Sequence, residues 1–334
     1  MSHHKTILCI TPNVSVDWTH LVPGFSPGRV WRAAEVSAGC GGKGVNVARA
    51  IRALGERAVC AGFLAGHAGR VAAEMAEREG LDGRWTWIDG ETRTNVIVLD
   101  PDGSHPTVLN APGPVVTGDG WPRLAAAVLD EASRADCICM CGSVPPGCAP
   151  ADVGQLVTTL LAFGRPVWVD ASGPVLGAAV DARPTGVKVN AAEAGEYLGR
   201  MIDTVDDAIA AAQTFRARGI ATVVLTLGGA GAVAVTGDGV WRTEPPPLHA
   251  TNPVGSGDAF LGGLVTALLI GHPMPCALRY ATAAGSASAL QAVTGLDRDT
   301  FRDVVRGVRI AAPTDFHPKS GPGSPPCRAW GGDV

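Results

Sequence analysis

Short apolar runs alternate with amphipathic segments along most of the chain. The alternation is most regular from residue 137 to residue 227, where apolar runs are separated by stretches with apolar residues every three or four positions. Strands that alternate with helices are typical of a central, mostly parallel sheet with helices on both faces, so we predict an α/β fold. The predicted strands are 6–10, 58–64, 137–141, 167–170, 186–189 and 221–227, and the predicted helices are 47–54, 71–79, 121–133, 153–163, 174–180, 191–198 and 205–218.

The C-terminal third adds a hairpin, 232–236 with 240–243, and then two or three helices through about residue 310. Two further regions, about 14–38 and 85–110, contain short strand-like pieces broken by Pro-Gly and Asp-Gly turns. They are too isolated to be stable alone, so we expect them to combine into a small β-sheet lid. The lid sheets of two copies of the chain can pair with each other, so a homodimer formed through the lid is one expected assembly.

The length and hydrophobic content of the chain indicate one domain over residues 1–311. It is followed by a Pro/Gly-rich tail, 312–334, which we expect to be disordered. The net charge of −4 and the absence of a basic block argue against nucleic acid as a partner. The chain shows no signal peptide and no apolar run of membrane-spanning length, so a cytoplasmic location without a membrane partner is expected.

Nine cysteines allow two interpretations. Cys137, Cys139 and Cys141 would face one side of a strand and could bind a metal. The C-x₂-C pairs of zinc sites are absent, which favours buried free thiols in a reducing compartment.

Two glycine-containing turns precede helices. In the first, Gly255, Ser256 and Gly257 lead into an apolar helix whose first turn carries Asp258. Glycines at a helix start leave N–H groups free for an anion, and a carboxylate beside them can accept a proton, which together suggests phosphoryl transfer. The alternative is that Asp258 is only a favourable residue near a helix start.

The second turn, 39–46, includes Gly42, Lys43 and Asn46 ahead of the helix 47–54. Lys and Asn donate to anionic and hydroxyl oxygens. A plain glycine-rich turn is the alternative, and the spacing of a P-loop is absent. A third loop, 142–147, contains Ser143 and follows a predicted strand at its carboxyl end, where α/β sheets bind ligands.

Taken together these motifs resemble, in order and spacing, those of the ribokinase-like (PfkB) sugar kinases over about residues 6–310. The matching stretches are TPNVSVD (11–17), GGKGVNVAR (41–49), TR (92–93), GSVPPG (142–147), KVNAAE (188–193) and VGSGD (254–258). Within the family the chain resembles the branch of 1-phosphofructokinase, tagatose-6-phosphate kinase and the minor 6-phosphofructokinase, which phosphorylates sugars that already carry a phosphate.

The resemblance implies a role for each matching residue. Asp258 would be the general base, and the N–H groups of Gly255, Ser256 and Gly257 would form the anion hole. Asp17, Gly42 and Asn46 would bind sugar hydroxyls, Lys43 and Arg93 the phosphate of the substrate, and Ser143 would assist. Lys188, Asn190, Thr226, Gly228, Gly231 and Ser286 would line the ATP site, and Asn190 and Glu193 would hold Mg²⁺ through water.

The function implied is ATP-dependent phosphorylation of fructose 1-phosphate, fructose 6-phosphate or tagatose 6-phosphate. A kinase of an unphosphorylated sugar or nucleoside and a non-catalytic regulator that binds sugar phosphate or nucleotide are the alternatives. The chain departs from the family at Asn252-Pro253, where many members have Asp-Thr, so a potassium site is left open. It also has Trp31 where the branch often has Asn.

Overall fold

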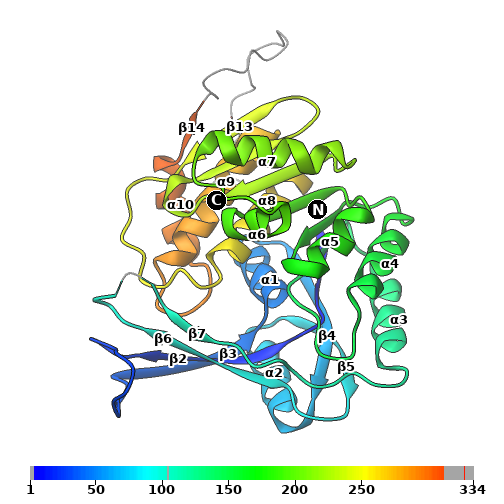
Figure 1. Ribbon diagram of the computed structural model, residues 1–334, viewed down its shortest axis with the longest axis vertical. Coiled ribbons are helices and arrows are strands. Elements are labelled where there is room, and N and C mark those ends of the chain that lie inside the picture. Colours follow the sequence, from blue (N-terminus) through cyan, green and yellow to red (C-terminus); the bar gives the residue numbers. More distant parts are fainter. Residues whose placement is uncertain (1–3, 104, 312–326, 328–334) are drawn as a thin grey trace.

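The computed structural model describes residues 4–103, 105–311 and 327. A ten-stranded sheet runs through the molecule in the order β14-β13-β12-β11-β10-β9-β8-β1-β4-β5 (Figure 1). The strands from β11 to β5 pair in parallel, and β12, β13 and β14 pair antiparallel beyond β11. The predicted parallel sheet is confirmed, and β14 is an additional edge strand that the pattern did not indicate.

The strands of the large sheet are β1 (Thr6–Thr11), β4 (Arg57–Ala65), β5 (Asp82–Ile88), β8 (Cys137–Cys141), β9 (Val167–Asp170), β10 (Gly186–Asn190), β11 (Thr222–Thr226), β12 (Ala232–Val235), β13 (Val240–Glu244) and β14 (Arg309–Ala311). The helices are α1 (Lys43–Ala53), α2 (Gly66–Arg78), α3 (Gly120–Ala132), α4 (Pro150–Leu161), α5 (Gly173–Asp181), α6 (Ala191–Leu198), α7 (Val205–Ala217), α8 (Ser256–Leu269), α9 (Met274–Ala289) and α10 (Arg298–Gly307), with a 3₁₀ turn, η1, at Gly228–Ala230.

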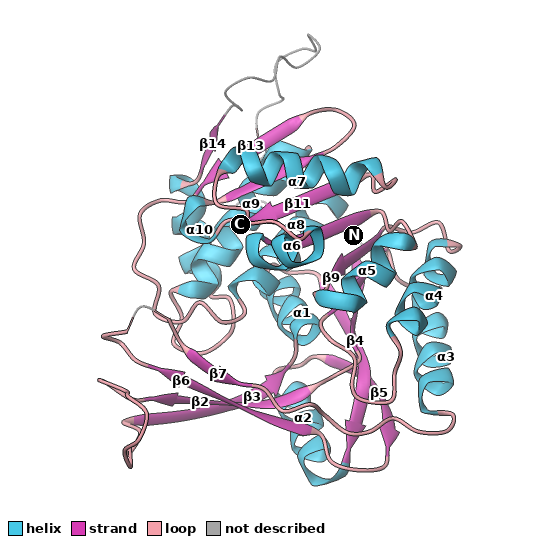
Figure 2. Cartoon of the chain, in the orientation of Figure 1, coloured by secondary structure: helices cyan, strands magenta, loops and turns pink. Residues whose placement is uncertain are grey.

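Helices cover both faces of this sheet (Figure 2). The core on one face contains residues of α1, α2, α8, α9 and α10, and the core on the other face contains residues of α3 to α7. Adjacent residues of β8 enter opposite cores: Cys137, Cys139 and Cys141 face the first, and Ile138 and Met140 face the second. This period of two explains why the central strands are apolar at every position.

A second sheet forms the lid, with strand order β3-β2-β6-β7. Its strands are β2 (Ser15–Leu21), β3 (Glu35–Gly41), β6 (Arg93–Leu99) and β7 (Thr107–Leu109). It extends from the large sheet at the lower left of Figure 1. The lid is confirmed, with one correction: Trp85–Ile88, expected in it, lie in β5, which pairs with β4 at the edge of the large sheet.

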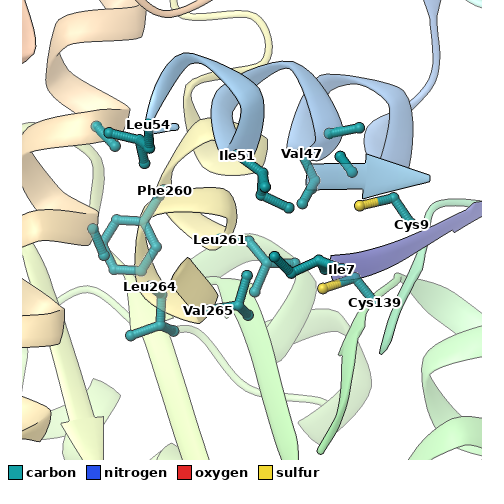
Figure 3. Packing of buried hydrophobic residues seen from close by; sticks show 14 of the residues in the cluster. Ile7, Cys9, Val47, Ile51, Leu54, Cys139, Phe260, Leu261, Leu264 and Val265 are labelled. Atoms are coloured by element: carbon teal, nitrogen blue, oxygen red, sulfur yellow. The ribbon is translucent and has the colours of Figure 1, made fainter. Parts of the chain in front are cut away.

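Helix α8 packs between α1 and α9, and it is buried on nearly every side. A Cβ on Gly262 would lie 2.8 Å from the Ala50 Cβ, and one on Gly263 would lie 2.8 Å from the Ala284 Cβ. Glycine at these two positions lets the three helices approach closely. In Figure 3, Leu261 of α8 lies beside Ile51 of α1 and Ile7 of β1, while the ring of Phe260 points away from the strands. This packing fixes the start of α8.

One cysteine prediction needs correction. Cys276 of α9 and Cys327 form a disulfide, so two of the nine cysteines are not free thiols. The other seven are free, and all but Cys148 are buried. No group of His, Cys, Asp and Glu suited to a metal ion occurs in the described part of the chain.

Apart from Cys327, the tail lies outside the described residues, so the structure does not test its predicted disorder. Within 4–103 and 105–311, no helix has the length and apolar character needed to span a bilayer.

Candidate active site

A cavity of about 1060 Å³ lies where the strands of the large sheet end, between α8 and the lid. Every residue predicted for the site lines it. These residues are Asp17, Gly42, Lys43, Asn46, Arg93, Ser143, Lys188, Asn190, Glu193, Thr226, Gly228, Gly231, Gly255, Ser256, Gly257, Asp258 and Ser286. The carboxyl ends of parallel strands meet at one edge of a sheet, which is why motifs far apart in sequence converge here.

The start of α8 forms the floor of the cavity. Gly255 is its N-cap in the left-handed conformation (φ 80°), and a Cβ there would lie 2.4 Å from the Thr294 Cγ2. The Ser256 N–H donates to the Pro253 carbonyl at 3.2 Å, so an anion would share this donor with the turn. A Cβ on Gly257 would lie 2.8 Å from the Lys188 Nζ. Lys188 therefore places a cation beside the helix dipole, and both attract a phosphate.

Asp258 is buried in the first turn of α8. Its Oδ2 accepts a hydrogen bond of 2.8 Å from the Asn46 Nδ2. Burial, together with the nearby charge of Asp170, raises the pKa of Asp258 to about 6, although Lys43, Lys188 and Asn46 oppose the shift. A carboxylate with a pKa near 6 is ionised at neutral pH and is a better proton acceptor than an exposed Asp.

Asp170 forms ion pairs with two lysines, Lys43 and Lys188, near the start of α8. This residue is completely buried at the end of β9; its Oδ1 accepts from the Lys43 Nζ and its Oδ2 from the Lys188 Nζ, each at 2.7 Å. Burial alone would raise the pKa of Asp170, but the two lysines hold it below its usual value. Lys188 is only 2% exposed, and its side chain has no other ion pair in the described residues. Asp170 therefore sets the position of both lysines.

Asn190 and Glu193 cap α6 reciprocally. The Asn190 Oδ1 accepts from the Glu193 N–H at 2.8 Å, and the Glu193 Oε2 accepts from the Asn190 N–H at 2.9 Å. The Glu193 Oε1 also pairs with the Lys43 Nζ at 2.7 Å. Burial opposes the charge of Lys43, but Asp170 and Glu193 outweigh it and raise its pKa.

These oxygens are already engaged by the chain, so they do not form a cage for a bare ion. Mg²⁺ usually retains several waters and binds through nucleotide phosphates with one or two carboxylates nearby. Glu193 and Asn190, which both line the cavity wall, fit such a hydrated ion.

The lid supplies a further carboxylate, that of Asp17. Asp17 of β2 pairs in register with Asn95 of β6, and the Asn95 Nδ2 donates to the Asp17 Oδ1 at 2.8 Å. The Ser15 hydroxyl donates to the same oxygen at 2.7 Å. A Cβ on Gly41 would lie 2.1 Å from the Asp17 Oδ2. Because both protein donors bind Oδ1, Oδ2 is left to accept from a ligand hydroxyl.

Arg93 occupies a different part of the cavity wall from Lys43. Its Nη2 donates to the Asn13 carbonyl at 2.8 Å and its Nη1 to the Ala111 carbonyl at 3.3 Å. Its Nε is buried with no hydrogen-bond partner in the described part of the chain, and burial lowers the pKa of Arg93. Ser143 accepts a hydrogen bond of 3.4 Å from the Asn13 Nδ2. Lys43 and Arg93 are thus held by separate groups, so their shared contact with one phosphate stays a prediction.

Backbone turns and prolines also line the cavity. Gly231 follows η1 with a φ of 94°, and a Cβ there would lie 1.9 Å from the Thr243 carbonyl oxygen. Thr226, Gly228 and Ser286 line the same cavity, together with the prolines of 245–247. A wall of this kind suits a flat apolar ring such as a purine.

Sequence reasoning missed three polar residues of the site, Asp170, Asn13 and Asn95. All three are buried, and the Oδ1 of Asn13 has no partner among the described residues. Asp170 carried a usable signal, because it is a lone charge at the carboxyl end of the apolar strand 167–170. Asn95 carried none, since its importance depends on pairing with Asp17 in another strand.

The fold and this cavity define a sugar-kinase type of protein, and comparison with known proteins agrees. The model of the pfkB family of carbohydrate kinases matches residues 6–300, and the chain belongs to that family. The 1-phosphofructokinase of Rhodobacter capsulatus is 36% identical over 279 residues, which cover 83% of this chain and 88% of that protein. The corresponding enzyme of Escherichia coli K12 is 31% identical over 292 residues, or 87% and 93% of the two chains.

Among solved structures, phosphofructokinase-2 from Escherichia coli in complex with substrates and products has a TM-score of 0.84 at 27% identity. The match covers 91% of this chain and 99% of that one. The protein is therefore a phosphofructokinase-like carbohydrate kinase.

Proposed function

We propose that the chain transfers the γ-phosphoryl group of ATP to a ketohexose that already carries a phosphate, with Asp258 as the general base. The observation that carries the proposal is the buried Asp258 at the start of α8, in a cavity that also contains Lys43, Lys188 and Arg93. Fructose 1-phosphate is the first candidate because the relatives above are named for it; fructose 6-phosphate and tagatose 6-phosphate follow.

The reaction assigns a task to each group. Asp258 takes the proton from the sugar hydroxyl, whose oxygen bonds to the γ-phosphorus while the bond to the β–γ bridging oxygen breaks and ADP leaves. The free Oδ2 of Asp17 and the side chain of Asn46 orient the sugar. Lys188 and the start of α8 stabilise the charge of the transferring group. Mg²⁺, held by Glu193 and Asn190 through water, would neutralise charge on the nucleotide phosphates.

The test is a panel that pairs each free sugar with its phosphate and measures ADP release. We expect turnover with one of the three sugar phosphates and little with the free sugars. The Asp258→Asn variant should lose most of kcat while it retains sugar-phosphate binding. Turnover of a free sugar or nucleoside alone would favour that other kinase activity, and binding without ADP release on any sugar would favour a regulator.

The panel is run with and without potassium, because Asn252 replaces the Asp that many family members carry. Both ends of its side chain are bound to the protein: Oδ1 accepts from the Val254 N–H at 3.0 Å, and Nδ2 donates to the Ala292 carbonyl at 3.2 Å. An unchanged rate without potassium is expected if no carboxylate is available to bind the ion.

We also propose that the chain dimerises through the lid. Trp18, Val36 and Leu109 are 39%, 47% and 62% exposed. Strand register places them on the lid face opposite Asp17 and Asn95. Burying these apolar side chains would cover the exposed face of the lid. A dimer mass by light scattering that falls to a monomer in Trp18→Asp supports this proposal, and a wild-type monomer contradicts it.

A further inference from the structure

Arg49 is the last residue of the stretch GGKGVNVAR, and none of the roles above uses it. It lies three residues after Asn46 on α1, so the two side chains share one face of the helix. Its Nη1 donates to the Asn46 Oδ1 at 2.6 Å, and its Nη2 donates to the Cys40 carbonyl at 2.5 Å. Nη2 also donates to the Glu79 Oε1 at 3.0 Å, and Nε donates to the Glu79 Oε2.

These contacts determine which way the Asn46 amide points. The Asn46 oxygen faces the guanidinium, and the Asn46 nitrogen therefore faces Asp258, to which it donates at 2.8 Å. A flipped amide would place its NH₂ group against the Arg49 N–H and its oxygen against the Asp258 carboxylate. Both contacts would be repulsive, so a charged Arg49 leaves one favourable orientation.

Arg49 also connects three segments of the molecule. Cys40 is near the end of the lid strand β3, Asn46 is on α1, and Glu79 follows α2. The Arg49 side chain is only 15% exposed. Burial disfavours its charge, but the hydrogen bonds and charge of Glu79 outweigh this and raise the pKa of Arg49. The guanidinium thus stays charged at any pH at which the enzyme is assayed.

We propose that Arg49 is a positioning residue for catalysis: it holds the Asn46 amide in the orientation that donates to Asp258 and ties the end of β3 to the same point. The inference rests on the proposed function, because it gives Arg49 a catalytic purpose only if Asp258 is the base. Arg49 touches neither the sugar nor the nucleotide in this scheme and acts through Asn46.

The experiment compares Arg49→Met and Arg49→Lys with the wild type in steady-state kinetics with the sugar phosphate that is turned over. Arg49→Met removes all the donors, and we expect a fall in kcat of roughly 10- to 100-fold, the usual effect of misplacing a catalytic group from a distance. Arg49→Lys keeps the charge but not the planar set of N–H donors of the guanidinium, so its kcat should lie between those of the wild type and Arg49→Met. Arg52→Met is the matched control, since Arg52 is an exposed arginine of the same helix that contacts the Gly80 carbonyl; its kcat should match the wild type.

The pH profile separates positioning from a structural role. Asp258 is surrounded by Asp170, Lys43, Lys188 and the Asn46 amide. When the amide no longer donates, the ionised form of Asp258 loses a hydrogen bond, so the acid limb of kcat/KM should move to higher pH in Arg49→Met. A change confined to KM and melting temperature, with kcat and the acid limb as in the wild type, would mean that Arg49 only anchors the lid and would overturn the inference.

A double-mutant cycle tests the route through Asn46. If Arg49 acts through that amide, Arg49→Met should reduce kcat little further in an Asn46→Ala background. Full additivity would overturn the inference. If circular dichroism shows that Arg49→Met is unfolded, Glu79→Gln replaces it, and it should shift kcat and the acid limb in the same direction by a smaller amount.

The Asp258→Asn variant distinguishes a failure of the inference about Arg49 from a failure of the proposed function. Normal turnover by Asp258→Asn removes the proposed base, whatever Arg49 does. An inactive Asp258→Asn together with a fully active Arg49→Met removes only the present inference.

Discussion

The buried carboxylate of Asp170 offers the sharpest prediction. Asp170→Asn keeps the size and shape of the side chain but removes the charge that pairs with Lys43 and Lys188, each at 2.7 Å. Lys43 retains Glu193 as a partner, whereas Lys188 is left buried with no other carboxylate partner among residues 4–103 and 105–311. The variant therefore isolates the effect of an uncompensated buried charge.

The expected size follows from that geometry. Removing one partner of a buried ion pair costs about 3–5 kcal/mol of unfolding free energy. An unfolding entropy of about 2.1 cal/mol/K per residue amounts to roughly 0.7 kcal/mol/K for 334 residues, so the melting temperature should fall by about 4–7 °C. The matched control is Asp181→Asn, which removes an exposed carboxylate 3.7 Å from Arg218 and should change little.

The pH dependence of this difference has a definite sign. The pKa of Asp170 is lowered in the folded protein, so its contribution is complete above the unfolded pKa and is lost as the pH falls through the folded pKa. The difference in melting temperature should stay constant from about pH 6 to 8 and shrink below about pH 4, near the unfolded value of Asp.

The same substitution should alter catalysis in a second, independent way. In the wild type, kcat/KM should fall as the pH drops through about 6, because Asp258 becomes protonated and cannot accept a proton. Loss of the Asp170 charge lowers the pKa of Asp258, so the acid limb should move to lower pH, opposite to the shift expected for Arg49→Met. Calorimetry and a pH series of initial rates measure both effects. A variant that melts with the wild type and keeps its acid limb would refute the reasoning.

Three further predictions concern the floor, the lid and the thiols. Gly257→Ala places a Cβ 2.8 Å from the Lys188 Nζ and should lower kcat more than it raises KM in steady-state assays; a wild-type kcat would contradict the proposed role of this turn. Asn95→Ala removes a donor from Asp17, and KM for the sugar phosphate should rise roughly 5- to 150-fold, the equivalent of about 1–3 kcal/mol; an unchanged KM would separate Asp17 from sugar binding. Thiol titration of the unfolded protein should find seven thiols before reduction and nine after it, and nine in both would exclude the disulfide.

Much of the fold was predictable because its signals are local. The strand 167–170 and the helix 191–198 have the predicted bounds, since a run of apolar residues or a capping pair decides them within a few positions. The sequence also predicts the strand 85–88, but the expectation that it belongs to the lid is wrong, because it pairs with β4 in the large sheet. Its sequence shows that it is extended, and nothing in it shows that β4 is its partner.

The candidate site was predictable as a set of residues and not as a set of contacts. The glycine turns, Asp258, Lys43 and Arg93 were identified from motifs, and all line one cavity. The ion pairs of Lys43 with Asp170 and Glu193 were not foreseen, because their partners lie 127 and 150 residues away. The disulfide between Cys276 and Cys327 was not predicted for the same reason, since spacing alone does not show which of nine cysteines pair.

The class of fold, the order of its elements and the residue types available for phosphoryl transfer follow from the sequence, because hydrophobic period, turn residues and short motifs act over a few residues. How those residues work together is visible only in the folded chain: Asp170 holds two lysines, Asn95 directs Asp17, and Arg49 orients Asn46 toward Asp258. Such contacts depend on which strands pair and how closely helices pack, and these are long-range consequences of burying the two cores.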